Sequence, residues 1–553
     1  MSKKTTGQWI IGKIRKRIPG VLIMTLSHMG SALLGVAFAF TCKNMIDHAL
    51  SRNEQSFFRA CLCQALIILG MLLCTVIYRH LHGRLAADID RDFKRSLFFR
   101  LTTGDYATVC GYHTGDLINR LNNDVRIVHE GVLGVLPNAA AMITKLIAAI
   151  GVLALLEPLF TVAVVSVGCL VLLVTGLLRP KIKAIHKKVS EEDGRVSGFI
   201  QEALEKLLMV QALDVAPQMQ QRSDGLLNRR YQAQMRQKNM SLLTHTAVHF
   251  LMNTAGFLAL IWCAFGLFAG TLSVGTLTAT TQLVSQLQRP FIGMSGIIPQ
   301  YMAMLASAER LMELEQIKSD EKADISLPDY TTITGIGAEN LTFTYDRDTV
   351  FSDTSFWLPT GGFVAVKGAS GIGKSTLLKL LLGIFHPQSG RLYAQYGDQR
   401  ITINRQTRSL FTYVPQGNLL LSGTLRENLT VVKPTATQEE IDQAVYVGAM
   451  DEFLPLLPDG LETRVGENAT GLSEGQSQRL AIARAVLGGA PILLLDECTS
   501  ALDEKTEQTV LHRLRDLPGR MCIAVTHRPA AHDLCDWTLA IDNGQVRAEK
   551  VYR

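Results

Sequence analysis

Residues Gly368 to Thr376 read GASGIGKST. The run before it, FVAVKG, is almost wholly apolar, as in a buried strand, and the run after it, KSTLLKLLLGI, has helical spacing. The stretch fits the pattern G-x-x-x-x-G-K-[ST], in which glycines let backbone N–H groups curl around phosphate oxygens. The positive end of the helix dipole points at the same place. We therefore predict that this turn binds the phosphates of a nucleotide.

Two side chains of this loop carry specific chemistry. Lys374 is expected to reach the β- and γ-phosphates, and Ser375 to offer its hydroxyl to Mg²⁺. The alternative is a glycine-rich turn without a ligand, but the flanking strand and helix favour the phosphate loop. The residues of this stretch that we expect at the nucleotide are Gly368, Ser370, Gly371, Gly373, Lys374, Ser375 and Thr376.

A second motif, PILLLDECTS, supplies carboxylates. A strand is predicted over Ile492–Leu495, because every position is apolar, which is typical of a strand buried on both faces. Asp496 then lies at the carboxyl end of this strand, where it can hold Mg²⁺ directly or through water. Glu497 is a candidate general base for the water that attacks the γ-phosphate, since phosphoryl transfer depends on a positioned water. The two motifs together predict ATP hydrolysis with Mg²⁺.

A third motif, GLSEGQSQRLAIARA, lies shortly before that strand. Ser473 is a candidate N-cap for a helix through Ala483, and Gly475 leaves backbone exposed. A helix that begins with a serine and a glycine is a second candidate anion site. An ordinary helix cap is the alternative.

The first three hundred residues are built for a membrane. Hydrophobic residues make up 47% of the 553-residue chain and charged residues only 19%, whereas a soluble domain has about 25% charged residues. A spanning helix needs about 20 mostly apolar residues. Six runs of that kind are Val21–Phe40, Phe57–Tyr78, Val132–Leu155, Leu159–Leu178, Ala247–Ala269 and Leu272–Met294.

Charge predicts the orientation of these spans. Lys and Arg are concentrated before the first span and in the long second and fourth connections, and the third and fifth connections have none. Positive-inside bias then places the N-terminus and both long connections in the cytoplasm. Six spans return the chain to that side, where ATP is available. The net charge of +6 is too small over this length to indicate nucleic acid as a partner.

The predicted architecture is an α-helical membrane domain of six long transmembrane helices followed by a C-terminal α/β P-loop ATPase domain. Both long connections have helical periodicity and are expected to extend the spans into the cytoplasm, with short transverse turns near Tyr112–Thr114 and Lys206–Leu213. The domains expected are an N-terminal amphipathic helix on the membrane surface (1–19), the transmembrane domain (20–315), a charged linker (316–335) and the nucleotide-binding domain (336–553).

The order of the motifs resembles that of the ATP-binding cassette (ABC) transporters, specifically exporters with six spans fused to one nucleotide-binding domain. GASGIGKST resembles Walker A, ILLLDE Walker B and LSEGQ the LSGGQ signature. The membrane half is similar as well, in YHTGDLINRLNNDV and SGFIQEALEKLLMVQAL, which resemble the two intracellular loops whose coupling helices dock on nucleotide-binding domains.

The resemblance implies further site residues. YVPQ makes Gln416 the glutamine that senses Mg²⁺, and VTHR makes His527 the switch histidine at the γ-phosphate. Tyr345 matches the aromatic residue that stacks on adenine, and Asp503 lies in the D-loop. The signature residues implied to contact ATP are Ser473, Gly475 and Gln476. Glu497, His527 and Gln416 are the implied catalytic residues, and Ser375, Gln416 and Asp496 the implied metal ligands.

Two positions depart from the family pattern. Glu474 replaces a glycine of the signature and adds negative charge near a phosphate-binding helix start. TRVGENATGLSEGQ resembles the TxVGExG loop, with Glu467 present but Ala469 where a glycine is usual. We expect the first departure to slow turnover or to be harmless, depending on where the side chain points.

The resemblance also implies a second protomer. A family site lies between Walker A of one domain and the signature of another, and this chain has one of each. We expect a dimer of half-transporters that exports a lipid, drug-like or other amphipathic molecule by alternating access, in a bacterial inner or plasma membrane. Three alternatives stay open: a subunit of a heterodimeric exporter, a peptide or natural-product exporter, and an ATP-gated channel or regulator. Six spans exclude a soluble P-loop machine.

Polar residues inside the spans are the available indication of cargo. Gln282, Gln286 and Arg289 fall on one face of the sixth span, and Lys145 lies within the third. They are expected to line the translocation cavity, with contacts between helices as an equal alternative. Lys145 would favour an anionic or amphipathic cargo.

Overall fold

The computed structural model describes residues 5–318, 333–345, 348–417, 420–466, 471–526, 528 and 533–552. The chain divides into two compact units. One unit is Met1–Thr102 with His113–Gln316, and the other is Thr103–Tyr112 with Ile317–Arg553. Most of the predicted linker lies outside the described residues, as do His527, Glu467 and Ala469.

The first unit is entirely helical over its described residues. A 3₁₀ turn, Arg15–Arg17, joins the first two helices, and a π-helical turn, Arg120–Asp124, joins α5 to α6. The helices are α1 (Thr6–Ile14), α2 (Ile18–Leu50), α3 (Glu54–Thr103), α5 (Thr114–Asn119), α6 (Val125–Leu156), α7 (Pro158–Glu205), α8 (Leu207–Ala212), α9 (Ala216–Phe268) and α10 (Val274–Gln316).

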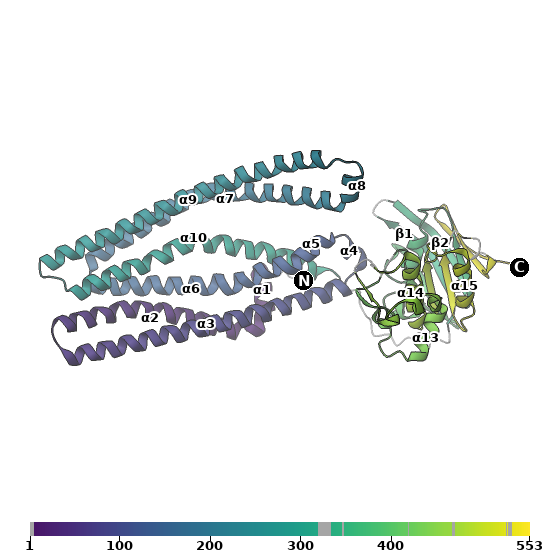
Figure 1. The fold of residues 1–553 in the computed structure, drawn as a ribbon, viewed down its shortest axis with the longest axis horizontal. Coiled ribbons are helices and arrows are strands. Elements are labelled where there is room, and N and C mark those ends of the chain that lie inside the picture. The colour runs from purple at the N-terminus through teal and green to yellow at the C-terminus, as the bar shows by residue number, and fades with distance from the viewer. Residues whose placement is uncertain are drawn as a thin grey trace. The chain divides into compact units, whose positions relative to one another are not determined.

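The long helices of this unit run side by side in pairs. α2 lies beside α3, α6 beside α10, and α7 beside α9, with α8 at the turn between the last two (Figure 1). Where α2, α6, α9 and α10 meet, small and aliphatic side chains such as Val36, Leu153 and Leu283 are buried. α8 falls within the transverse turn predicted at Lys206–Leu213.

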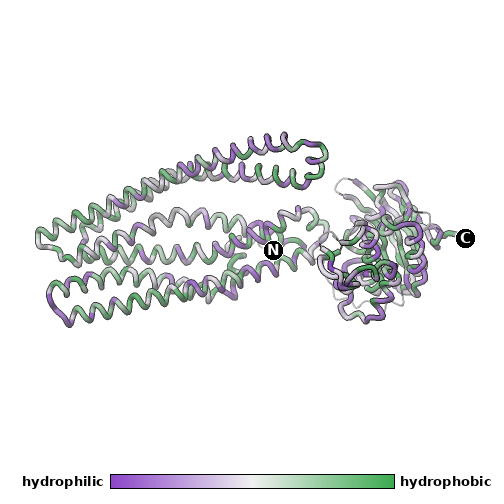
Figure 2. The backbone as a smooth tube through the Cα atoms, viewed as in Figure 1, coloured by the Kyte–Doolittle hydropathy of each residue, from purple (hydrophilic) through white to green (hydrophobic). Residues whose placement is uncertain are grey.

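The hydropathy of these helices is that of a membrane domain. Long stretches of them are hydrophobic, and polar residues become frequent toward the end that carries α5 and α8 (Figure 2). Over the described residues, four helical segments are long and apolar enough to cross a membrane: Thr6–Leu50, Glu54–Thr103, Thr114–Leu156 and Ala216–Phe268. α7 adds a shorter apolar stretch, Pro158–Leu170. Many large apolar side chains in these helices are exposed, as a lipid-facing surface requires.

The N-terminal helix α1 forms as expected, but its apolar face contacts protein. Trp9, Ile10 and Ile14 are buried. The indole ring of Trp9 packs edge-on against Phe93 of α3, with 5.7 Å between ring centroids. Its Nε1 donates a hydrogen bond of 2.9 Å to Glu315 of α10. Trp9 therefore anchors α1 to α3 and α10, whereas Ile11 of the same helix is exposed.

The second unit begins with a short helix from the first long connection. This helix, α4 (Tyr106–Cys110), starts earlier in the chain than the turn predicted near Tyr112–Thr114. The reason is a cap: Asp105 accepts a hydrogen bond of 2.9 Å from the backbone N–H of Thr108. Periodicity alone does not reveal such a local start signal.

The ATPase part of this unit is built on two larger sheets. A four-stranded antiparallel sheet has the order β2-β1-β4-β5, and a six-stranded sheet has the order β12-β11-β3-β10-β9-β6. In the second sheet only β12 is antiparallel to its neighbour. The strands are β1 (Ile333–Tyr345), β2 (Asp348–Pro359), β3 (Gly362–Lys367), β4 (Ser389–Tyr396), β5 (Gln399–Thr402), β6 (Phe411–Val414), β7 (Gly423–Thr424), β8 (Arg464–Val465), β9 (Ile492–Asp496), β10 (Met521–Val525), β11 (Trp537–Asp542) and β12 (Gln545–Lys550).

Both faces of the six-stranded sheet are buried, which explains the continuous apolar runs of its strands. On β9, Leu493 and Leu495 point into one core, and Ile492 and Leu494 into another. The first core is covered by helices and the second by α11 and the antiparallel sheet. The helices are α11 (Lys374–Leu381), α12 (Leu425–Thr430), α13 (Gln438–Val447), α14 (Glu474–Leu487) and α15 (Glu504–Arg515).

Candidate active site

The glycine-rich loop lies between β3 and α11, as the sequence predicts. Gly373 has φ of 110° and precedes the first residue of α11. A Cβ at this position would come within 2.3 Å of a methyl carbon of Val350, so both the backbone angle and the packing require glycine. The loop therefore keeps its backbone bare at the point where the helix N-terminus opens.

Lys374 is directed back over this loop. The side chain is buried, and its ammonium group donates hydrogen bonds to the carbonyl oxygens of Gly368 at 2.9 Å and Ala369 at 3.0 Å. Carbonyls hold the ammonium without neutralising its charge. The positive charge is thus positioned at the loop, where phosphate oxygens of a bound nucleotide would lie.

Ser375 of α11 and Asp496 of β9 are in direct contact. The Ser375 hydroxyl donates to one carboxylate oxygen of Asp496 at 2.9 Å, and the phenol of Tyr413 donates to the other at 2.9 Å. Asp496 is only 1% exposed, so these donors replace the water that it lacks. Burial, followed by the charge of Asp496, raises the pKa of Tyr413 above its ordinary value and keeps the phenol protonated. Tyr413 was not predicted, although it lies in the same YVPQ segment as Gln416.

Glu497 contacts Gln416. The amide Nε2 of Gln416 donates to a carboxylate oxygen of Glu497 at 2.7 Å. Glu497 has φ of 48°, which is uncommon outside glycine, and its N–H donates to the carbonyl of Val525 at 3.1 Å. Backbone strain of this kind is concentrated at functional sites.

Tyr345 stands at the edge of an aromatic cluster. Its hydroxyl lies 3.3 Å from that of Thr376 in the loop, and its ring is 40% exposed. It packs edge-on against Phe343 and Phe385, with centroid distances of 4.9 Å and 5.4 Å. Phe385 also contacts Tyr106 of α4, at 5.9 Å. The ring predicted to face adenine is therefore held by aromatic neighbours that reach α4, and the sequence did not indicate Phe385 or Tyr106.

The signature residues form a second group. Ser473 caps α14: its Oγ accepts from the N–H of Gln476 at 3.2 Å, and the Gln476 side chain accepts from the N–H of Ser473 at 2.9 Å. The predicted N-cap is thus confirmed. Gly475 lies against the loop before α15, where an added Cβ would be 3.0 Å from the carbonyl oxygen of Ala501. Asp503 caps α15, and its hydrogen bonds with Thr506 lower its pKa.

Three further residues connect this group to the strand ends. Gln478 of α14 donates to Ser500 Oγ at 3.1 Å and accepts from the N–H of Ala501 at 3.1 Å. Arg528 donates to the carbonyl oxygen of Ser500 at 2.7 Å. It also donates at 3.1 Å to Glu507, which is 1% exposed. Sequence reasoning missed Gln478, Glu507 and Arg528, although Arg528 directly follows the predicted switch histidine.

Two of the residues expected to line a cargo cavity, Gln282 and Gln286, contact α2. Gln286 Nε2 of α10 donates to the carbonyl of Gly35 in α2 at 2.8 Å, and Gln282 Nε2 lies 3.8 Å from Cys42 Sγ. Gln286 Oε1 is buried and has no hydrogen-bond partner among the described residues. Lys145 is half-buried on α6. The side chain of Arg289 lies outside the described part of the structure.

Comparison with known protein families decides between transporters and other P-loop proteins. The model of the ABC transporter transmembrane region matches residues 21–291, and the ABC transporter model matches residues 351–500. The chain belongs to the ABC transporters. It fuses a transmembrane region to an ATPase domain, so this ABC exporter is an integral membrane protein that binds and hydrolyses ATP.

Related ABC transporters match most of the chain. An ATM1-type heavy metal exporter of Novosphingobium aromaticivorans is 26% identical over 96% of this chain and 89% of its own. A fatty acid ABC transporter ATP-binding/permease protein of Mycobacterium bovis is 26% identical over 79% of this chain and 69% of its own. The structure of a bacterial Atm1-family ABC exporter with ATP bound superposes with a TM-score of 0.80, at 25% identity, over 96% of this chain and 95% of that one.

Proposed function

We propose that this ABC exporter works as a pair of half-transporters that uses Mg-ATP to move an amphipathic molecule out of the cell. The observation that carries the proposal is the gathering of Lys374, Ser375, Asp496, Glu497 and Gln416 at one end of the parallel sheet, in a chain whose other unit is a helical membrane domain. Without the membrane unit, the same site would serve any P-loop ATPase.

The residues present fit Mg²⁺. Ser375 Oγ and Asp496 are already 2.9 Å apart, and Mg²⁺ prefers oxygen ligands from one or two side chains together with substrate phosphates. The amide oxygen of Gln416 would be a third protein oxygen near this position. We infer that Ser375, Asp496 and Gln416 would hold the ion. When bound, Mg²⁺ neutralises charge on the β- and γ-phosphate oxygens.

The other side chains of the site have separable roles in this proposal. Lys374 binds the β- and γ-phosphate oxygens, together with backbone N–H groups from Gly368 to Thr376. Tyr345 supports adenine. Glu497 accepts a proton from the attacking water in this proposal, and the hydrogen bond from Gln416 supports a shared role of the two side chains at the γ-phosphate. His527, which lies outside the described residues, is proposed as a further contact to the γ-phosphate.

A second protomer would complete the site. Ser473, Gly475, Gln476 and Asp503 form a group of their own at the N-termini of α14 and α15. In the proposed dimer this group faces the phosphates held by the other protomer, so ATP joins the two domains and hydrolysis lets them part. Exposed Ser473 and Glu474 are available for such a contact. The N-terminus and the ATPase domain would lie in the cytoplasm, at a bacterial inner membrane.

The cargo is proposed only as a chemical class. Relatives carry names that refer to heavy metals and to fatty acids, so the scaffold accommodates different cargo. Gln282, Gln286, Arg289 and Lys145 are the proposed cargo contacts. The unpaired, buried Oε1 of Gln286 is an acceptor for a hydrogen-bond donor on the cargo.

The experiment that tests this proposal measures ATP hydrolysis by the purified chain, alone, in lipid nanodiscs. We expect basal hydrolysis without a second gene product, and stimulation by a subset of amphipathic lipids, drugs or fatty acids. The Gln286→Ala variant should need a higher concentration of that ligand for half-maximal stimulation. No hydrolysis by the chain alone, but hydrolysis after co-expression with a related half-transporter, would replace the homodimer with a heterodimer. Stimulation by peptides alone would favour peptide export.

A further inference from the structure

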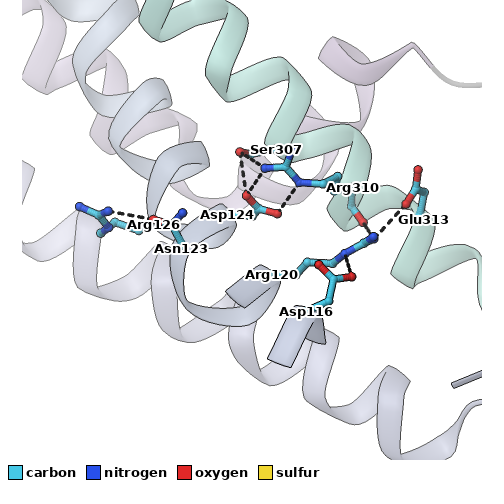
Figure 3. Close-up of polar contacts among 8 residues, drawn as sticks. All are labelled: Asp116, Arg120, Asn123, Asp124, Arg126, Ser307, Arg310 and Glu313. Carbon is cyan, nitrogen blue, oxygen red and sulfur yellow. Dashed lines mark hydrogen bonds and ion pairs between the residues drawn. The ribbon is translucent and has the colours of Figure 1, made fainter. Parts of the chain in front are cut away.

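A fully buried carboxylate lies in the membrane unit, far along the chain from the ATP site. Asp124 is 0% exposed and ends the π-helical turn before α6. It accepts hydrogen bonds from Ser307 Oγ at 3.0 Å and Arg310 Nε at 2.8 Å, and a further one from the Arg310 guanidinium (Figure 3). Each of these donors belongs to α10. The Arg310 guanidinium thus donates hydrogen bonds to both oxygens of the Asp124 carboxylate.

Because Asp124 is fully buried, its carboxylate needs the hydrogen bonds from Ser307 and Arg310 to offset the loss of water. A buried, ionised carboxylate costs several kcal/mol unless an opposite charge and hydrogen bonds compensate it. Among the described residues, Arg310 and Ser307 are the groups that hydrogen-bond to it. Moving α10 away from α6 at this level would therefore leave Asp124 unsatisfied, whereas moving the two helices together costs nothing at this site.

A second ion pair of opposite polarity lies one turn away. Arg120, at the start of the π-helical turn, donates to Glu313 at 2.9 Å and to the backbone carbonyl of Arg310 at 3.0 Å (Figure 3). Its Nε also donates to Asp116 at 2.8 Å. A π-helical turn is rare and often occurs at functional sites. In this protein the first and last residues of the turn, Arg120 and Asp124, both bond to α10.

These ion pairs lie close in the chain to the points where the backbone passes between the two compact units. The backbone passes between the two compact units at three places: after Thr102, after Tyr112 and after Gln316. Asp116 and Arg120 follow the second of these, and Glu313 precedes the third. Near the first, Arg100 of α3 donates to the backbone carbonyl of Glu315 at 3.0 Å. The last turns of α10 are thus hydrogen-bonded to α3, which leads to the first crossing, and to the segment that follows the second crossing.

We propose that Asp124 and Arg310 are positioning residues for transport, which make the cytoplasmic start of α6 and the end of α10 move as one lever. The proposal rests on the ATP-driven cycle proposed above. It assigns these residues no contact with ATP or cargo. Their effect is to pass motion from the ATPase unit to the spans through two helices at once.

The test uses full-length protein in nanodiscs, with one spin label per protomer at Leu50, the exposed last residue of α2. A background without accessible cysteines is needed. Asp124→Asn is the informative variant, because it removes the buried charge and leaves the half-exposed Arg310 hydrated. Arg126→Gln is the matched control: this arginine lies on the same segment, but is 59% exposed and bonds only Asn123 and Glu130 among the described residues.

Four measurements are made on each variant: ATP affinity, thermal midpoint, amide hydrogen exchange of Ser307–Gln316, and the label distance with and without Mg-ATP and vanadate. For Asp124→Asn we expect ATP affinity within about twofold of wild type and amide exchange about tenfold faster in the α10 segment. The nucleotide-driven shift in label distance should fall by about half or more. Arg126→Gln should match wild type in each measurement.

The other outcomes would contradict the lever, the joint action of the two residues, or the proposed transport cycle. A wild-type shift in Asp124→Asn would overturn the lever, and so would a loss of ATP binding with a lowered thermal midpoint, since the pair would then serve folding alone. The double variant Asp124→Asn/Arg310→Gln should equal Asp124→Asn, and a further loss would mean that the two residues act independently. No shift in the wild-type protein itself would refute the proposed transport cycle, not the role of this pair.

Discussion

Gln416 and Glu497 are in direct contact: the amide nitrogen of the first lies 2.7 Å from a carboxylate oxygen of the second. Gln416 follows β6, and Glu497 follows the neighbouring strand β9. The parallel register of these strands places both residues at the same edge of the sheet. The proposed metal-sensing residue and the proposed base are therefore joined by a direct hydrogen bond.

Replacing Glu497 by Gln should nearly abolish hydrolysis and spare binding. Loss of a general base lowers a rate about 100-fold or more, and an amide can still hydrogen-bond to Gln416. ATP should then remain trapped, which is measured as retained labelled nucleotide against phosphate release. Glu504→Gln, an exposed position at the start of α15, is the control and should leave both unchanged. Undiminished turnover in Glu497→Gln would remove this residue as the base.

Replacing Lys374 by Ala should weaken ATP binding. Charged hydrogen bonds are worth about 1.5–3 kcal/mol each, which corresponds to about a tenfold or larger rise in Kd. Equilibrium binding of a fluorescent ATP analogue measures this, with Lys505→Ala, an exposed lysine of α15, as the control. Equal affinity in the Lys374 variant and the control would contradict the phosphate cradle.

Arg528 should be needed because Glu507 is buried. Arg528→Gln would leave the carboxylate of Glu507, 1% exposed, without its ion-pair partner, at a cost of about 3 kcal/mol in stability. The thermal midpoint in detergent measures the loss. The double variant Arg528→Gln/Glu507→Gln should recover much of it, because no buried charge remains. If Arg528→Gln alone leaves the midpoint unchanged, this pair does not hold the loop before α15.

Variants of Glu474 can distinguish an effect on the stability of α14 from an effect on ATP hydrolysis. It is exposed in the first turn of α14, where a carboxylate is favoured by the helix dipole. Glu474→Gly should lower stability by about 1 kcal/mol through dipole and helix propensity together, while hydrolysis stays equal or becomes faster. Glu474→Gln removes the charge and keeps the propensity, so its turnover isolates the charge effect. A sharp loss of hydrolysis in both variants would give the glutamate a role of its own.

Cys498, next to Glu497, should be inert in the folded protein. Burial raises the pKa of its thiol to about 12, and does the same for Cys522. An unfolded thiol has a pKa of about 8.5, so this contribution to stability is complete below that pH and is lost as the pH rises toward 12. Iodoacetamide at about pH 8.5 should modify both residues only after denaturation. Mass spectrometry of peptides checks this, and rapid labelling of native Cys498 would contradict its burial.

The parts that the sequence predicted share one property: their signals are local. The strand, glycine loop and helix around Gly373, the strand that ends at Asp496 and the cap at Ser473 each depend on residues within a few positions of one another. Apolar periodicity likewise predicted the long helices and the transverse helix α8. Such patterns are read directly along the chain.

Apart from the start of α4, which a local cap at Asp105 sets, the parts that the sequence missed depend on contacts between distant segments. Tyr413 reaches Asp496, and Arg528 reaches Glu507, because the sheet brings the ends of separate strands together. Asp124 pairs with Arg310 of a different helix, and no pattern in the sequence around either residue predicts this pair. Likewise, the sequence did not predict that Trp9 joins α1 to Phe93 and Glu315, whereas the location of α1 on a membrane surface stays a prediction.

The central claim is that ATP closes two protomers on each other, and one distance measures it most directly. A spin label is placed at Leu456, an exposed position of the ATPase unit, in the Glu497→Gln variant in nanodiscs. We expect a broad distribution of distances between the protomers without nucleotide and a shorter, narrower one with Mg-ATP. The same distribution under both conditions, or no coupling between labels because the protein is a single protomer, would contradict it.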